Sequence, residues 1–205
     1  MQHSDILFST FQLNDSVEQV SICGYFGSLD ATSPFDISKV LPCLEGAKQL
    51  QKVEFRDMML TDEKALFDFI ARHKVPYLQL MGVSFFPCDF GEFCDLLEQS
   101  SITEFVCIVK NVCNKLAYAG VVSSLASSLP GTLRRLRMNG FDRCDLQRTI
   151  NSILGRCPML EILSLCSSMP RLRRPPSVAP ISVPLHPTLQ KLEHNYSEIW
   201  RRGNE

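Results

Sequence analysis

Cysteine and histidine are the residues of this chain whose types could support metal binding or nucleophilic catalysis. The 205 residues include nine cysteines, at positions 23, 43, 88, 94, 107, 113, 144, 157 and 166, and four histidines, at positions 3, 73, 186 and 194. No C-x-x-C pair occurs, and the histidines do not join the cysteines in a ligand pattern. The odd number of cysteines, several at positions that suit small apolar side chains, favours reduced thiols that pack as hydrophobes. We therefore expect no metal site and no cofactor.

Motifs of enzyme catalysis are also missing from the sequence. It contains no G-x-S-x-G, no H-E-x-x-H and no P-loop. His73 follows an expected helix and His194 falls in the last expected strand, so neither is expected to share a face with a cysteine or a carboxylate. The sequence predicts a non-enzymatic protein with no catalytic residue.

Composition argues against nucleic acid and membranes as partners. The chain carries 21 basic and 22 acidic residues, a formal charge of -1, which indicates no general attraction to nucleic acid or to a membrane surface. Its apolar runs are too short for a membrane span, and the first residues lack the basic and apolar regions of a secretory signal. These features predict a cytoplasmic protein.

A repeated sequence pattern predicts the secondary-structure elements of the chain. An apolar pattern L-x-x-L-x-L, with conservative apolar replacements, recurs about every 29 residues. Its seven blocks cover residues 17–22, 50–55, 75–80, 102–107, 133–138, 160–165 and 189–194. A period of this length is typical of a solenoid in which each unit adds one strand and one return element. Function is then expected on a surface that the repeats build together.

Most segments between the blocks show the apolar spacing of a helix. The sets are Leu66, Phe69 and Ile70; Phe93, Leu96 and Leu97; Val122, Leu125, Ala126 and Leu129; and Leu146, Ile150, Ile153 and Leu154. Thr61 is the expected N-cap of the first of these helices. In the first unit, Ser33 and Pro34 predict a helix start, and Pro42 is expected to limit or kink that helix. Each interior unit therefore reads strand, turn, helix.

This arrangement resembles the leucine-rich repeat family, specifically its ribonuclease-inhibitor-like class, over residues 17–194. We expect a curved α/β horseshoe with parallel strands on the concave face and helices on the convex face. The chain departs from the family pattern where Asn or Cys usually follows the strand. It has Tyr25, Met58, Val83, Lys110, Phe141 and Ser168 at those positions. The resemblance therefore implies a divergent member with a more apolar corner.

Four regions are predicted along the chain. Residues 1–16 are expected to cover the N-terminal edge, and residues 17–168 to form the repeats. Residues 169–188 form a connector with six prolines that cannot be helical, either an ordered strap or a mobile linker. Residues 189–205 supply a terminal strand and a tail. The chain could also be a piece of a longer solenoid.

The candidate site comes from positions three, five and seven of the blocks, which should face the concavity. An apolar strip is expected there between two basic borders, with a polar residue on its rim: Tyr77, Met81, Val106 and Ile108 form the strip, Lys52 and Arg56 one border, Arg135 and Arg137 the other, and Asn139 the rim. An apolar centre with charged borders is typical of a protein-binding surface. The alternative is that the aliphatic residues are there only because they suit strands.

These residues predict a scaffold or adaptor that binds a protein partner, one with an acidic surface. Glu104 and Glu161 interrupt the basic rows, which disfavours nucleic acid. A second hypothesis is that the chain activates a small GTPase through a rim loop, using Asn139 or the arginines, as some proteins with similar repeats do. The sequence leaves the partner's identity and the oligomeric state open.

Overall fold

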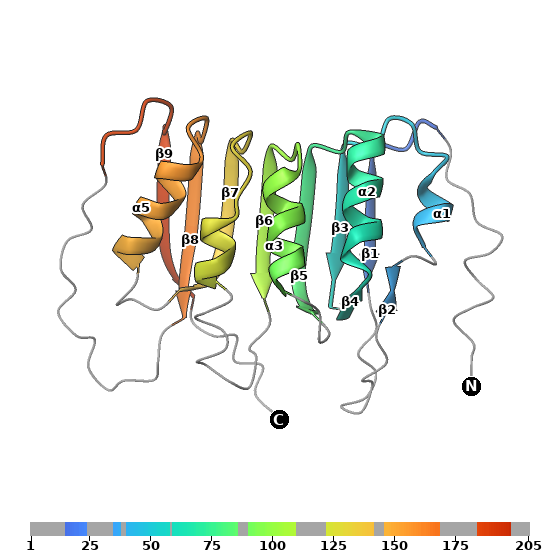
Figure 1. Ribbon diagram of the computed structural model, residues 1–205, viewed down its shortest axis with the longest axis horizontal. Coiled ribbons are helices and arrows are strands. Elements are labelled where there is room, and N and C mark those ends of the chain that lie inside the picture. Colours follow the sequence, from blue (N-terminus) through green and yellow to red (C-terminus); the bar gives the residue numbers. More distant parts are fainter. Residues whose placement is uncertain are drawn as a thin grey trace, which may run out of the picture.

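Seven parallel strands form one open sheet, and they follow each other in chain order (Figure 1). The computed structural model describes residues 15–23, 35–37, 40–57, 59–85, 90–109, 122–141, 146–168 and 184–197. The strands are β1 (Gln19–Cys23), β3 (Lys52–Arg56), β5 (Tyr77–Phe85), β6 (Glu104–Val109), β7 (Arg135–Phe141), β8 (Ile162–Ser168) and β9 (Lys191–Ser197). Each strand falls on one of the seven predicted blocks.

The strand register matches the repeat. Position three of every block is paired with position three of the next, which aligns Gln19, Lys52, Tyr77, Glu104, Arg135, Ile162 and Lys191 in one row. Positions four, five and six are aligned in the same way in all of these strand pairs. Because side chains alternate along a strand, this register places positions three and five of all seven blocks on one face of the sheet.

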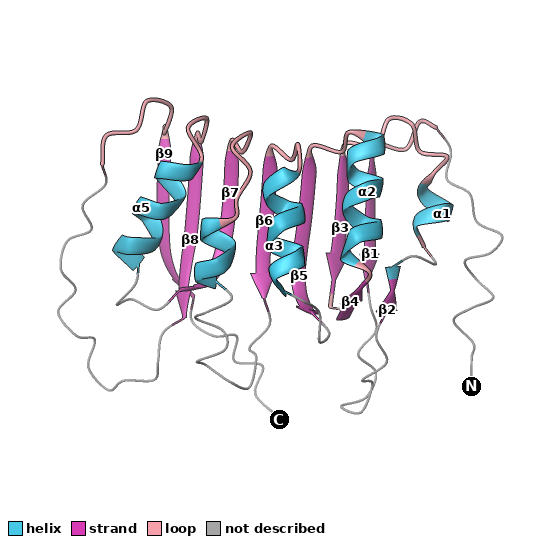
Figure 2. Ribbon diagram, in the orientation of Figure 1, coloured by secondary structure: helices cyan, strands magenta, loops and turns pink. Residues whose placement is uncertain are grey.

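The described helices lie together on the other face of the sheet (Figures 1 and 2). The longer ones are α2 (Glu63–His73), α3 (Phe90–Gln99), a helix over residues 122–127, and α5 (Leu146–Arg156). Parallel strands need crossover connections of this length, and each helix follows the strand of its own unit. The α/β fold is thereby confirmed as an open parallel sheet that alternates with helices, an arrangement compatible with a solenoid.

The core lies between these helices and the side chains at positions four and six of the blocks. At most 2% of each of Val53, Phe55, Leu78, Leu80, Phe105, Cys107, Leu136, Met138, Leu163 and Leu165 is exposed. The helices contribute Leu66, Phe69, Phe93, Leu97 and Ile153, all equally buried. Complete burial of a large apolar side chain contributes about 1.5–3 kcal/mol, so this layer is the main source of stability.

The first unit differs from the prediction. Helix α1 covers only Leu41–Leu44, and Pro42 lies in its first turn, where the missing N–H costs no hydrogen bond. Pro42 therefore lies at the start of this helix, and Ser33 and Pro34, where the sequence predicts an earlier start, lie outside the described residues. Residues 35–36 form the short strand β2, which pairs with β4 (Met59–Thr61). Strand β4 also pairs with the end of β5, and the repeat pattern does not predict this second ladder.

The N-cap of α2 is Asp62, not Thr61. The Asp62 carboxylate accepts a hydrogen bond from the backbone N–H of Ala65 at 3.1 Å, although the Asp62 backbone is left-handed, with φ of 60°. Both residue types are good N-caps, so composition alone could not decide between them. The helix ends at Lys74, which is also left-handed.

A repeated hydrogen-bond pattern joins consecutive units just before each strand. At five junctions, the carbonyl of block position two accepts the N–H groups of positions two and three of the next block; for example, Thr103 accepts from Arg134 and Arg135 at 2.8 and 3.1 Å. At the junction between β3 and β5, Pro76 occupies position two and has no N–H to donate. This shared pattern shows that the blocks are structural repeats.

Two threonines add a side-chain version of the same link. Thr132 and Thr188 each stand directly before a block, and their hydroxyls donate to the carbonyls of Ile102 and Leu160, at 2.9 and 2.8 Å. Both acceptors occupy position one of the preceding block. These bonds tie each unit to its neighbour at the point where the chain enters the sheet.

Some sequence predictions fall outside the described residues. These include nearly all of the expected N-terminal cover, most of the proline-rich connector, and Tyr25, Met58 and Lys110 of the corner. Val83 is described, and only 1% of it is exposed, so an apolar side chain is buried at this corner. Among the described helices, none is long and apolar enough to cross a membrane.

Candidate functional site

The candidate site is the sheet face opposite the helices, which we call the open face. It is formed by positions three and five of each block and by position seven, the residue that directly follows the block. Within the described residues no helix covers it. The nine predicted site residues all lie there. Lys52, Tyr77, Met81, Val106, Ile108 and Asn139 are half-buried, whereas Arg56, Arg135 and Arg137 are exposed.

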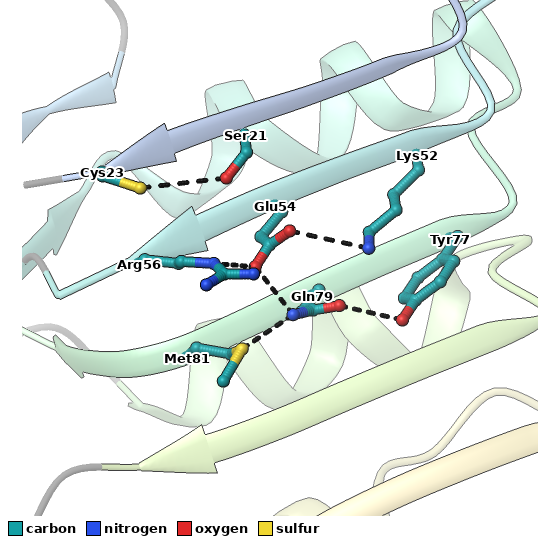
Figure 3. A network of polar contacts seen from close by, with 8 residues as sticks. All are labelled: Ser21, Cys23, Lys52, Glu54, Arg56, Tyr77, Gln79 and Met81. Carbon is teal, nitrogen blue, oxygen red and sulfur yellow. Dashed lines mark hydrogen bonds and ion pairs between the residues drawn. The ribbon is translucent and has the colours of Figure 1, made fainter.

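Glu54 organises the part of the open face over β3 and β5 (Figure 3). It stands between Lys52 and Arg56 on the same strand and forms ion pairs with both, the one with Lys52 at 3.5 Å. Its carboxylate also accepts a hydrogen bond of 2.7 Å from the amide of Gln79. Only 4% of Glu54 is exposed, and its carboxylate is surrounded by these three polar partners. One carboxylate thus partly neutralises the first basic border.

Two residues of the predicted apolar strip belong to the same network. The hydroxyl of Tyr77 donates to the side-chain oxygen of Gln79 at 2.8 Å, and the Gln79 amide also donates to the sulfur of Met81. The ammonium of Lys52 lies 4.7 Å from the centre of the Tyr77 ring, in the geometry of a cation–π contact. These contacts fix side chains on the surface, so this part of the face is pre-ordered.

The second basic border, on β7, is less neutralised. Arg135 pairs with Glu104 on the neighbouring strand at 3.4 Å, and Arg134 pairs with Glu161 at 3.2 Å. Arg137 has no ion pair within 4 Å among the described residues. Of the predicted basic residues on the open face, it alone lacks a close acidic partner in the part of the chain that the structure describes.

Strand β9 carries a further acidic residue of the open face, Glu193. Glu193 pairs with Lys191 on its own strand at 2.6 Å. The hydrogen bond and charge of Lys191, a hydrogen bond from Ser164 and the more distant charge of Arg137 together hold the pKa of Glu193 below its ordinary value. Glu193 is therefore ionised at neutral pH and already has a close cation.

A shallow hollow of about 200 Å³ lies over β6, β7 and β8, and Glu193 of β9 forms part of its wall. Val106, Arg135, Arg137, Ile162, Ser164 and Glu104 also line it. Val106 and Ile162 give it apolar sides, and both arginines of the second border reach it. The structure thus joins Val106 to Arg135 and Arg137, but it leaves Tyr77 and Met81 in the separate network over β3 and β5.

The helix side carries a hollow of similar volume between the helix over residues 122–127 and α5. Serine and threonine hydroxyls line most of it, and Arg148 is its one charged side chain. It has no apolar anchor comparable to Val106 with Ile162, so the open face is the better binding surface.

Sequence reasoning missed four residues that shape the site. Glu54, Gln79, Ser164 and Glu193 stand at position five of their strands, and the first three are buried although no described helix covers them. The alternation Lys52, Glu54, Arg56 was a usable signal, because side chains two apart on a strand share a face. It predicts an internal ion pair in place of a free basic border.

Burial governs the chemistry of two described cysteines. Burial raises the pKa of the Cys107 and Cys157 thiols to about 12, so both are protonated. In the part of the chain that the structure describes, no group of three His, Cys, Asp or Glu side chains is placed to hold a metal ion.

A scan against protein-family models and a search of curated proteins each found no match for this chain.

Proposed function

We propose that this chain is a non-enzymatic interaction module, of the leucine-rich repeat type, that binds a protein partner on the open face of its sheet. The observation that carries the proposal is the sheet's asymmetry: in the described residues, helices cover one face, while the other displays half-buried apolar and exposed basic side chains. Apolar anchors that lose water on binding supply affinity, and charged borders supply selectivity.

The charge of the open face supports an acidic partner. The side chains at positions three, five and seven of the seven blocks give the open face a net charge of +2. The five basic residues are Lys52, Arg56, Arg135, Arg137 and Lys191, and the three acidic residues are Glu54, Glu104 and Glu193. The whole chain has a formal charge of -1, so the open face is basic relative to the rest of the molecule. Such a difference orients an acidic protein toward this face during encounter.

The test compares open-face and helix-face charge reversals. Tagged wild-type chain, the double variant Val106→Glu/Arg135→Glu and the control Arg148→Glu are used for affinity capture with quantitative mass spectrometry. Each recovered partner is then purified and titrated against all three proteins. We expect the double variant to lose at least about tenfold in affinity, which corresponds to about 1.4 kcal/mol, while Arg148→Glu binds as wild type does.

Circular dichroism and thermal unfolding of each variant check that the fold is retained. If the folded double variant keeps every partner of the wild type, the open face is not the binding surface. Any small GTPase among the partners is assayed for GTP hydrolysis with and without the chain. The loop expected to act on a GTPase would follow β7, the strand that carries Asn139. Its first residues, 142–145, lie outside the described part of the chain.

A further inference from the structure

The arginines of β7 differ in how far their charge is already satisfied. Arg135 has Glu104 at 3.4 Å, and Arg134 has Glu161 at 3.2 Å. Arg137 is exposed, and no carboxylate of the described residues lies within 4 Å of its nitrogens. A guanidinium carries five N–H donors in a planar fork, so Arg137 keeps its binding capacity for an incoming acceptor.

The surroundings of Arg137 favour a ligand that is partly apolar. Val106 and Ser164 are its register partners on β6 and β8, and Val106 and Ile162 line the hollow that Arg137 enters. An apolar group that covers these two side chains excludes water from the guanidinium. A charge-assisted hydrogen bond gains strength when water is excluded in this way.

The charges of the hollow limit how negative that ligand can be. Glu104 and Glu193 line opposite sides of it and repel any added negative charge. The charges of Arg135 and Arg137 are equal in number to those of Glu104 and Glu193. Lys191, which pairs with Glu193, adds one more positive charge and leaves a small positive excess. A single carboxylate suits this balance better than a phosphate group, which carries close to two negative charges at neutral pH.

We propose that the hollow binds one aspartate or glutamate side chain of an extended segment of the partner, with the carboxylate on the Arg137 guanidinium and a neighbouring aliphatic side chain against Val106 and Ile162. This inference rests on the proposed function and adds the chemistry that the partner must present. Arg137 is the residue that reads the acid, and Arg135 supports it while paired with Glu104.

The probe is an array of synthetic peptides, each with a central glutamate between aliphatic residues and uncharged polar residues elsewhere. Matched peptides carry glutamine or phosphoserine in place of the glutamate. The full chain is applied as wild type, as Arg137→Gln and as Arg134→Gln. The control removes the same charge from the same segment of the chain, but Arg134 does not line the hollow. Hits are measured again in solution by fluorescence anisotropy.

We expect wild type and Arg134→Gln to bind glutamate peptides at least about tenfold more tightly than the glutamine peptides, and Arg137→Gln to lose this preference. Arg137→Lys keeps the charge without the planar fork and should retain only part of the preference. A preference that survives Arg137→Gln, equal losses in Arg134→Gln and Arg137→Gln, tighter binding of phosphoserine peptides, or no binding of any glutamate peptide would each overturn the inference.

These outcomes separate the inference from the proposed function. If captured partners are lost with Val106→Glu/Arg135→Glu while peptides show no Arg137-dependent preference for glutamate, binding on the open face stands and the acid-reading role of Arg137 fails. If the double variant keeps every partner, the proposed function itself fails.

Discussion

At the scale of single residues, Glu54 shows how a sheet face without a helix over it can still bury a carboxylate. Lys52 and Arg56 flank it on its own strand, and Gln79 donates to it from the next strand. Only 4% of the residue is exposed, with these three polar partners around the carboxylate. A carboxylate held in this way contributes more to stability than one that is free in water, because three donors depend on it.

Glu54→Ala should therefore lower the free energy of unfolding by about 1–3 kcal/mol, since it leaves the Gln79 amide with only the weak sulfur acceptor of Met81 and leaves Lys52 and Arg56 without this carboxylate. Glu104→Ala is the matched control, because Glu104 also lies on the open face but is more exposed and has one ion pair, with Arg135. Its expected loss is below about 1 kcal/mol. Urea unfolding followed by circular dichroism measures both, and a control that loses as much as Glu54→Ala would contradict this ranking.

At the scale of elements, the end of α2 carries a local strain. Lys74 caps this helix with a left-handed backbone, φ of 53°, and its N–H bonds to the carbonyl of Ala71 at 3.3 Å. Glycine is the usual residue at such a position, because it has no Cβ to crowd the following carbonyl. The chain then continues directly into the buried Val75, so the turn itself cannot relax.

Lys74→Gly should raise the free energy of unfolding by about 0.5–1 kcal/mol, because it removes this Cβ conflict at the helix end. Lys74→Ala keeps a Cβ and removes the same charge, so it serves as the control and should leave the stability nearly unchanged. Thermal unfolding of the three proteins at one pH gives the comparison. If glycine and alanine shift the midpoint equally, the effect comes from the lost lysine and not from the backbone.

The elements also show what could be predicted from the sequence. Alternation of apolar residues placed all seven strands in their register, because positions four and six had to be buried under helices. The same rule placed the predicted site residues on one face. The apolar period alone could not show that Glu54 pairs with both residues of the first border, although the alternation of charges along β3 indicates it. Nor could it show that Arg137 lacks a close acidic partner among the described residues, because that depends on side-chain geometry between strands.

One boundary prediction was wrong, and two short strands were missed, for local reasons. The first helix begins at Leu41 with Pro42 in its first turn, whereas the sequence suggested a start near Ser33. A proline is compatible both with a helix start and with a helix stop, so its position alone was ambiguous. Strands β2 and β4 were missed because two or three residues are too few to show a period.

At the scale of the whole molecule, each strand of the open sheet contacts mainly its neighbours in the sheet order, so stability should vary along the sheet. Leu136 and Leu192 both occupy position four of their blocks, on β7 and β9. Leu136 is 1% exposed under the helices, whereas Leu192 is only partly buried against the core. Strand β7 has a strand on each side, and β9 is the last strand of the sheet order.

Leu136→Ala should therefore lower the free energy of unfolding by about 2–5 kcal/mol, the range for a cavity in a packed core. Leu192→Ala deletes the same atoms at the same repeat position and should cost clearly less, because part of the side chain already contacts water. Native-state hydrogen exchange provides the independent readout: the amides of β9 should exchange faster than those of β7. Equal losses and equal exchange would contradict a stability gradient, whereas the expected difference would show that β7, which carries Arg137, is more stable than the last strand of the sheet order.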